Sequence, residues 1–269
     1  ASDDASGLAI ADKLRTQVTS INQGISNGNS AIALLQITDK SMAEQSKILD
    51  TIKSKLIQAN TDTTSTAGRT AIAKDVTKLL QQLNNIGEQT NYNGTTLLQK
   101  ARTTLNASTE GNLTAARTAK GGLSFQIGEG TADLITTRTI NSNVAGLKLS
   151  ALAKAVRSGA GMSAGATAGT TGVFTRTMAQ SGQKAIDKAI TTLNGYRGDI
   201  GSTQNQVESA VRNLMTQATN IKNAESVIRD VDYAEESANF NKLNIISQAG
   251  SYAISQSNAT QQNVLRLLQ

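Results

Sequence analysis

The sequence has no cysteine, histidine, proline or tryptophan, and aromatic residues make up only 3% of its 269 residues. Without cysteine the chain forms neither disulfides nor thiolate sites. Without histidine it cannot build a Ser-His-Asp triad, an imidazole general base or a histidine-ligated metal site. We therefore expect no catalytic residues, no cofactor and no bound metal, and we predict that the protein is not an enzyme.

The scarcity of aromatics and the absence of proline also bear on the fold. Ala, Ser, Thr, Asn, Gln and Leu dominate the chain, which argues against a bulky globular core, and no proline is present to break a long helix. No apolar run reaches the roughly 18 residues of a membrane-spanning helix, and no basic-then-apolar leader is visible, so we expect neither a membrane span nor a cleavable signal peptide. The composition favours long, slender helices.

The net charge of +6 does not indicate nucleic-acid binding. Lysine and arginine alternate with aspartate and glutamate, as in "DKLRTQ" and "KAIDKAI", whereas a phosphate-binding face would gather its cations on one side. We therefore expect no nucleic-acid partner.

A long helix is predicted from about residue 7 to 59. Its apolar residues recur at steps of three and four or their sums, which is the pattern of a narrow coiled-coil stripe; they are Leu14, Val18, Ile21, Ile25, Ile32, Leu35, Met42, Leu49 and Leu56. Gly28, Asp39, Ser46 and Lys53 occupy positions that the stripe skips. A second helix is predicted from about 68 to 89, and the short connection favours an antiparallel pair.

The middle of the chain contains the signals for β-structure. Asn93-Gly94 in "TNYNGTTLL" predicts a tight turn. "LSFQIGEGTADLITTRTI" alternates Leu123, Phe125 and Ile127 on one face and resumes after a glycine-containing turn, which predicts a strand pair. Residues 141–180 include the glycine- and alanine-rich "RSGAGMSAGATAGTTG", which favours a flexible or surface insertion.

The strongest helical period lies in 182–230. Its apolar positions follow one seven-residue repeat, with Arg197, Gln204 and Glu225 at the gaps, and the core candidates here are Val207, Val211, Leu214 and Ile221. A separate stripe follows that no earlier segment is left to cover; its members, with the apolar chain end, are Phe240, Leu243, Ile246, Ala249, Tyr252, Ala253, Val264, Leu265, Leu267 and Leu268. An apolar stripe of this kind needs a partner.

A single narrow stripe does not stabilise a lone helix, so the long helices should pack together. We predict a mainly α protein, an elongated antiparallel helical bundle or coiled-coil rod with a small β-hairpin insertion. The expected divisions are 1–140 for the N-terminal rod helices and hairpin, 141–181 for a short variable insertion, 182–230 for the C-terminal rod helix, and 231–269 for the separate helix.

Two other patterns are interpreted as structural. The glycines near 128–130 and 159–172 lack the Lys-Ser/Thr ending of a phosphate loop. Asp230, Asp232, Glu235 and Glu236 match no calcium loop, and acidic residues are favoured at the start of a helix.

The chain resembles bacterial flagellins, in a style similar to the epsilon-proteobacterial branch. The resemblance depends on "ASDDASGLAIADKLR", "QTNYNGTTLL", "FQIG" and the long ending "IRDVDYAEESANFNKLNIISQAGSYAISQSNATQQNVLRLLQ". It covers about 1–100 and 182–269, and in the middle only "FQIG". Relative to that family, we expect the usual N-terminal helical segment to be missing.

The resemblance implies a structural subunit that self-assembles into the bacterial flagellar filament for motility. It implies type III export without a cleaved signal, an extracellular location in the filament, and 231–269 as a filament-core helix that pairs with the missing segment and with neighbouring copies. The implied partners are further copies of the chain, a flagellin export chaperone, and the flagellar cap and junction proteins.

The resemblance also concerns the flagellin-sensing Toll-like receptor. Flagellins that activate it carry a Gln-Arg pair, followed four residues after the Arg by Leu, on the first long helix. The matching positions here are Asp50, Thr51 and Lys55, and the acidic residue of the second helix matches Asp75. Loss of an arginine donor and of an apolar anchor predicts weak receptor binding and activation.

Two alternatives stay open from the sequence. A hook-filament junction protein shares flagellin-like ends and rod helices, although the complete flagellin ending argues against it. A coiled-coil secretion-tip or adhesin subunit would bind a host surface as a monomer and would not polymerise.

Overall fold

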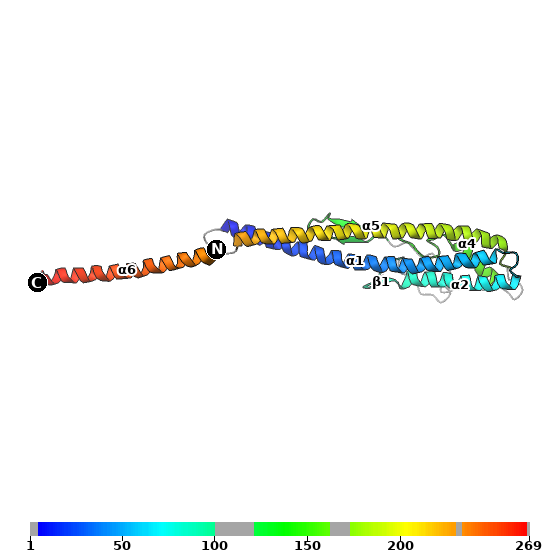
Figure 1. Cartoon of the computed structure of the whole chain (residues 1–269), viewed down its shortest axis with the longest axis horizontal. Coiled ribbons are helices and arrows are strands. Elements are labelled where there is room, and N and C mark those ends of the chain that lie inside the picture. Colours follow the sequence, from blue (N-terminus) through cyan, green and yellow to red (C-terminus); the bar gives the residue numbers. More distant parts are fainter. Residues whose placement is uncertain (1–4, 100–120, 162–172, 230–232, 268–269) are drawn as a thin grey trace. The chain divides into compact units, whose positions relative to one another are not determined.

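The computed structural model describes residues 5–99, 121–161, 173–229 and 233–267. The chain divides into two units: one is formed by residues 17–218 and the other by residues 1–16 together with 219–269. Figure 1 shows the long helices that make up most of both units. The candidate core residues and the candidate receptor-facing residues lie largely in the first of these units, and the C-terminal helix lies in the second.

Long helices dominate the described residues, as the absence of proline favours. The helices are α1 (Ala5–Ala59), α2 (Thr66–Gln89), α4 (Ser150–Gly159), α5 (Arg176–Arg229) and α6 (Tyr233–Leu267), and the strands are β1 (Asn91–Tyr92), β2 (Thr95–Thr96), β3 (Ser124–Gln126) and β4 (Leu134–Thr136). The mainly α fold class is therefore confirmed, and so are helices close to the ranges expected at 7–59 and 68–89.

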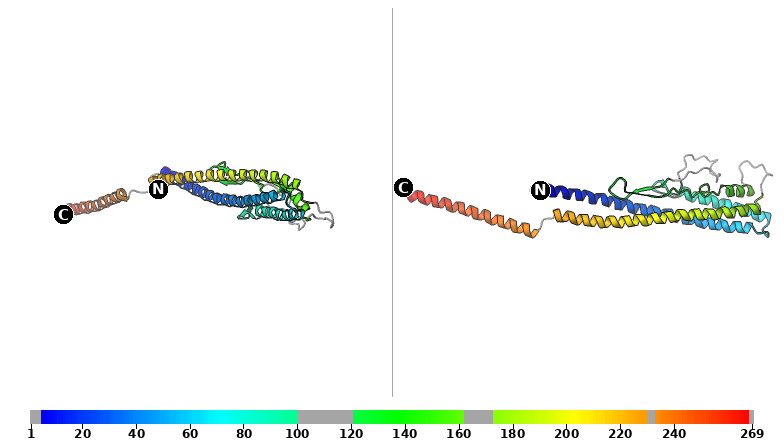
Figure 2. Two further views of the ribbon diagram at one scale, coloured as in Figure 1. Left: turned by 45° about the vertical axis from the view of Figure 1, so that its right-hand side comes forward. Right: turned by 90° about the horizontal axis from the view of Figure 1, so that it is seen from above.

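Helices α1 and α5 lie antiparallel within the unit 17–218. Gly28 of α1 faces Val211 of α5, and Asp39 is paired with Arg197, with 2.8 Å between Oδ1 and Nε. Nearer the other end, Lys53 Nζ lies 2.7 Å from Asp187 Oδ1. Residue numbers on α5 fall as those on α1 rise, and Figure 2 shows the two helices running side by side.

Helix α2 returns along α1 after a short connection. Ser65 caps its start by accepting a hydrogen bond from Gly68 N at 3.1 Å, which satisfies one of the free N–H groups of the first turn. Arg69 Nε donates to Ala59 O at 2.9 Å and ties the beginning of α2 to the end of α1. The connection therefore closes the pair, as its length predicts.

Both predicted β-features are present as separate two-stranded sheets. β1 and β2 are joined by Asn93 and Gly94, whose φ angles of 49° and 78° are the left-handed values that a two-residue hairpin turn requires. β3 pairs antiparallel with β4, with Phe125 opposite Ile135. The strand-pair prediction is confirmed, with shorter strands than the alternating pattern suggests.

Gly24 lets the β3–β4 hairpin approach the main chain of α1. A Cβ atom on Gly24 would lie 2.0 Å from the carbonyl oxygen of Ile127, and next to it Asn27 Nδ2 donates to Gln126 O at 2.9 Å. Helix and hairpin are thus in backbone contact, which only glycine allows at this position.

The core of the unit 17–218 is built from helix faces and two loop segments. Of the candidate core residues, those that are buried are Ile21, Leu35, Met42, Leu49, Leu56, Val207, Val211 and Leu214, and those that are half-buried are Val18, Ile25 and Ile32. Leu14 and Ile221 are also half-buried but belong to the other unit.

Helix α4 is a feature that the sequence analysis did not predict. The range 141–180 was expected to be a flexible or surface insertion, yet Leu152, Ala153 and Val156 of α4 are buried. Phe174 is fully buried as well, and a Cβ atom on Gly159 would lie 2.5 Å from its Cβ. The glycine- and alanine-rich stretch 162–172 lies outside the described residues.

Candidate functional site

The most unusual surface of the chain is the apolar side of α6. The helix extends over 35 residues, a length of about 50 Å at 1.5 Å per residue. Its large apolar side chains are 56–76% exposed; they are Phe240, Leu243, Ile245, Ile246, Tyr252 and Ile254, and together they are called the α6 apolar surface below. Large apolar residues concentrated on one helix in this way mark an interaction site.

The α6 apolar surface extends around much of the helix. At about 100° per residue, Phe240 and Tyr252 lie about 120° apart around the axis, and Ile245 and Ile246 point in directions about 100° apart. A helix with apolar residues all round is normally covered from several sides. One flat partner therefore does not suffice for α6.

The structure places the candidate interface residues in two groups. Phe240, Leu243, Ile246, Ala249, Tyr252 and Ala253 are exposed on α6. The side chains of Val264, Leu265 and Leu267, and the whole of Leu268, lie outside the described residues. Ile245 and Ile254 are equally exposed but were missed; Ile245 falls off the stripe that the three-and-four spacing follows, whereas Ile254 lies on it, between the directions of Phe240 and Leu243.

Neither a metal-holding cluster nor a membrane-spanning helix accompanies this surface within the described residues. No group of three or more His, Cys, Asp or Glu side chains there could hold a metal ion, and no described helix is long and apolar enough to cross a membrane. Asp230 and Asp232, the acidic residues interpreted as structural, lie outside the described residues.

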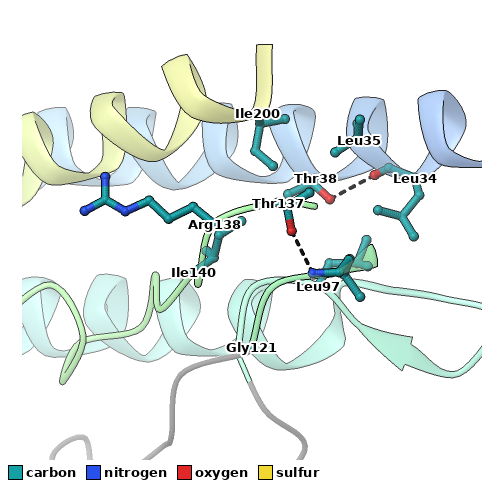
Figure 3. A pocket seen from close by; sticks show the side chains of 10 residues that line it. Leu34, Leu35, Thr38, Leu97, Gly121, Thr137, Arg138, Ile140 and Ile200 are labelled. Carbon is teal, nitrogen blue, oxygen red and sulfur yellow. Dashed lines mark hydrogen bonds between the residues drawn. The ribbon is translucent and has the colours of Figure 1, made fainter. Parts of the chain in front are cut away.

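The cavity in Figure 3 has a volume of only about 10 Å³ and is lined by residues such as Leu34, Leu35, Ile140 and Ile200. Figure 3 shows these apolar side chains directed toward it from α1, α5 and the segment before α4. This volume is that of about one water molecule. It offers no room for a substrate.

The candidate receptor-facing residues lie along α1 and α2. Asp50 and Thr51 are exposed on α1, and the Thr51 hydroxyl donates to Lys47 O at 2.9 Å. Lys55 Nζ lies 2.8 Å from Asp75 Oδ2 on α2. The hydrogen bond from the Lys55 ammonium, followed by its charge, holds the pKa of Asp75 below its ordinary value. The acidic residue matched on the second helix, Asp75, is therefore already paired with Lys55.

Comparison with known proteins identifies the chain's relatives. The model of the bacterial flagellin N-terminal helical region matches residues 1–103, and that of the bacterial flagellin C-terminal helical region matches residues 183–268. Flagellin of Bacillus subtilis is 31% identical over 100% of this chain and 87% of its own length. Flagellin A of Helicobacter pylori is 28% identical, over 100% of this chain and 92% of its own length.

Two solved structures share the fold. Bacillus cereus flagellin superposes with a TM-score of 0.50 at 23% identity, covering 74% of this chain and 94% of that one. A putative flagellar hook-associated protein from Vibrio parahaemolyticus gives 0.62 at 14% identity, covering 84% and 98%. At these identities the likeness shows the fold alone, so the second match does not favour the junction-protein alternative.

The comparisons correct the sequence-based assignment in one respect. The expectation that the N-terminal helical segment is missing is wrong, because the N-terminal helical region model matches residues 1–103, which contain α1 and α2. The resemblance to the epsilon-proteobacterial branch stays a prediction, because the relatives include flagellins of Helicobacter and of Bacillus alike. A helical repeat is set by how the helices pack, so it does not distinguish one branch of the family from another.

Two findings together establish the family. One relative is 31% identical and is covered over 87% of its length, and both flagellin helical-region models match this chain. The chain is a member of the bacterial flagellin family, a structural, non-enzymatic filament subunit of the extracellular bacterial flagellum.

Proposed function

We propose that the α6 apolar surface is the interface through which copies of this chain polymerise, with 231–269 as the filament-core segment. The observation that carries the proposal is the exposure of its six large apolar side chains. Polymerisation itself follows from the family; the residues that drive it are the proposal. Neighbouring copies would cover Phe240, Leu243 and Ile246 on one side and Ile245 and Tyr252 on another.

The magnitudes favour a cover made of several copies. Burial of one large apolar side chain contributes about 1.5–3 kcal/mol, so six would contribute about 9–18 kcal/mol. Association costs an estimated 4–15 kcal/mol in lost translational and rotational freedom. A contact that covers half of the surface is therefore marginal, whereas a lattice that covers all of it is stable. Repeated contacts that do not close into a ring extend as a helical filament.

The test is a paired set of serine substitutions on α6. Leu243→Ser with Ile246→Ser removes two central apolar side chains, and we expect it to abolish polymerisation. The matched control is Asn241→Ser with Gln248→Ser, which changes two exposed polar residues of the same helix and should polymerise as the wild type does. Filament yield is measured by sedimentation and electron microscopy, and circular dichroism checks that the helix content is unchanged.

The two pairs separate the interface from helix propensity. Leucine, isoleucine, asparagine and glutamine all lose or gain only tenths of a kcal/mol on replacement by serine in an exposed helix. Filaments of normal length from Leu243→Ser with Ile246→Ser would refute the proposed interface. Loss of polymerisation in the control pair would show that α6 acts through its polar residues instead.

We also propose that an export chaperone covers the α6 apolar surface before assembly, and that the cap and junction proteins bind the same helix at the filament end. An exposed surface of this size in a monomer promotes aggregation unless it is covered. The Leu243→Ser, Ile246→Ser pair should therefore lose a chaperone complex seen with the wild type by native mass spectrometry. An unchanged complex would place the chaperone elsewhere.

For the flagellin-sensing Toll-like receptor we propose weak binding. Asp75 is paired with Lys55 at 2.8 Å, so a receptor cation would have to displace an internal one. Thr51 offers a hydroxyl that is already donated to Lys47 O, in place of a guanidinium with five donors. Both differences remove charge-assisted contacts of the kind that dominate hot spots.

The receptor proposal is tested by gain of function. Thr51→Arg with Lys55→Leu should raise the response of receptor-bearing reporter cells to purified monomer by at least tenfold, since tenfold corresponds to about 1.4 kcal/mol of binding free energy. Thr51→Lys with Lys55→Ala is the control, because it changes both positions without supplying the arginine guanidinium or the leucine side chain. A strong response to the wild-type monomer would contradict the proposal.

A further inference from the structure

The sequence contains three Asn-Gly dipeptides, at residues 27–28, 93–94 and 194–195, and all of them lie in the unit 17–218. Asparagine is a chemically labile residue, because the main-chain nitrogen of the next residue can attack the Cγ atom of its amide and close a five-membered ring. Glycine as the next residue has no Cβ atom to crowd this attack. By sequence alone the three dipeptides are equally reactive, so a difference between them must come from the structure.

Two of the three dipeptides lie inside long helices, 27–28 in α1 and 194–195 in α5. Inside an α-helix each main-chain N–H donates to the carbonyl four residues earlier, so the glycine nitrogen is engaged and the main chain is not free to rotate toward the side chain. The Asn27 amide is held as well, since its Nδ2 donates to Gln126 O at 2.9 Å and its Oδ1 accepts from Gln23 Nε2 at 3.0 Å. Both helical dipeptides are therefore kept in an unreactive geometry.

The third dipeptide forms the turn between β1 and β2. Asn93 and Gly94 are both exposed, and their φ angles of 49° and 78° are those of the two central residues of a hairpin turn. The hydrogen bonds of such a turn join the residues that flank it, so the N–H of the second central residue is not part of the ladder. A Cβ atom on Gly94 would meet nothing within 4 Å. The nitrogen that would attack therefore lies in open space.

The rotation that brings this nitrogen to the Cγ atom breaks less structure in the turn than in the helices. β1 and β2 are joined by only two residue pairs, with Tyr92 opposite Thr95 next to the turn, and a two-stranded hairpin on its own is marginally stable. In α5 the same rotation at residues 194–195 breaks hydrogen bonds of a central helical turn beside the buried Leu193. Because loop segments open at a lower free energy than core helices, the turn reaches the reactive geometry more often.

We propose that Asn93 is a site of spontaneous deamidation. The Gly94 nitrogen forms a bond to Asn93 Cγ and loses its proton, and the Cγ–Nδ2 bond breaks and releases ammonia. Water then opens the ring at one of its two carbonyl groups, which leaves aspartate or isoaspartate at position 93. The net reaction consumes one water, releases one ammonia and needs neither oxidant nor reductant. It adds one negative charge to the chain.

The two products have different effects on the hairpin. Aspartate, like asparagine, tolerates the left-handed conformation, so it keeps the turn. Isoaspartate places an additional methylene group in the main chain between positions 93 and 94, which a two-residue turn does not accommodate. Leu97 N donates to Thr90 O at 3.2 Å at the base of the hairpin, and Leu97 and Leu98 are buried directly after β2. Isoaspartate therefore loosens a segment that is anchored in the core.

The test compares the three dipeptides within one protein. The folded full-length monomer is incubated in mildly alkaline buffer and digested with trypsin, which places the dipeptides on the separate peptides 16–40, 79–100 and 189–197. Mass spectrometry follows the conversion of amide to carboxyl group in each peptide, fragmentation locates it, and a sample digested without incubation gives the background. We expect Asn93 to react at least tenfold faster than Asn27 and Asn194. Tenfold corresponds to about 1.4 kcal/mol between the local openings.

The controls separate structure from accessibility and from sequence. Asn194 and Gly195 are both exposed although they are helical, so this dipeptide is the matched control for accessibility. In guanidinium chloride the helices are lost, and the three rates should converge. Asn93→Gln should abolish the reaction at position 93, because the longer side chain would have to close a six-membered ring. Equal rates at Asn93 and Asn194 in the folded monomer, or a difference that persists after unfolding, would overturn the proposal.

Discussion

Replacement of Gly24 by alanine tests whether α1 and the β3–β4 hairpin are in backbone contact. The new Cβ atom would lie 2.0 Å from Ile127 O and 3.0 Å from Ile127 C. Both are main-chain atoms, so the clash cannot be relieved by a side-chain rotation. Either the hairpin or the helix must move.

The expected loss follows from three contributions. Overpacking in a well-packed core costs about 1–3 kcal/mol. Displacement of the hairpin also breaks the hydrogen bond from Asn27 Nδ2 to Gln126 O, which is worth about 1 kcal/mol. Alanine returns about 1 kcal/mol through its higher helix propensity. The net expectation for Gly24→Ala is a loss of about 1–3 kcal/mol in the free energy of unfolding.

The assay is urea denaturation of the monomer, followed by circular dichroism. Gly195→Ala is the control, because a Cβ atom on Gly195 meets nothing within 4 Å; it should gain about 1 kcal/mol from helix propensity alone. Asn27→Ala should lose about 1 kcal/mol without a clash. If Gly24→Ala were as stabilising as Gly195→Ala, the helix and hairpin would not be in contact and the reasoning would be refuted.

Two further predictions concern ion pairs. Arg197→Met should cost up to about 1 kcal/mol of unfolding free energy, because it leaves the partly buried Asp39 without its pair. Arg138→Met breaks the more exposed pair with Asp199 and should cost less in the same denaturation assay. Equal losses for the two variants would contradict the argument. Lys55→Ala should return the pKa of Asp75 upward toward its ordinary value, measured by carboxyl NMR titration, since the Lys55 hydrogen bond is the main cause of the lowered pKa. Because the pKa of Asp75 is lower in the folded protein, the Lys55–Asp75 pair stabilises the fold at a pH above the ordinary carboxyl pKa, and this stabilisation is lost as the pH falls through the lowered pKa. The difference in unfolding free energy between wild type and Lys55→Ala should therefore shrink on acidification. A difference that grows on acidification would contradict this prediction.

The helical repeat predicted the long helices. The positions where the repeat is interrupted turn out to be places where α1 and α5 meet, which the sequence did not reveal. Asp39 interrupts the stripe of α1 and Arg197 interrupts that of α5, and the structure brings these two gaps together as an ion pair. Gly28, another gap, is where α5 comes closest, since a Cβ atom there would lie 2.3 Å from Val211 Cγ2. Neither pairing follows from one helix alone, because the register between α1 and α5 is set by the whole stripe.

Other features depend on contacts between distant segments. Leu34 and Ile52 are buried outside the narrow stripe, because α1 packs against α2 on one side and α5 on another. The buried position of Gln45 depends on the Ser142 carbonyl, 97 residues away. Helix α4 was missed because its neighbours in the sequence are glycine and alanine. For the interface, spacing found one face of α6 but not Ile245, which points to another side of the helix.

The central claim is that the α6 apolar surface is exposed in the monomer and buried in the filament. The chain contains no cysteine, so Ile246→Cys gives a single label site on this surface. Its rate of reaction with a thiol reagent should be close to that of a free thiol in the monomer, at least tenfold lower in the filament, and restored when the filament is depolymerised. Equal rates in monomer and filament, or a thiol already protected in the monomer, would contradict the account.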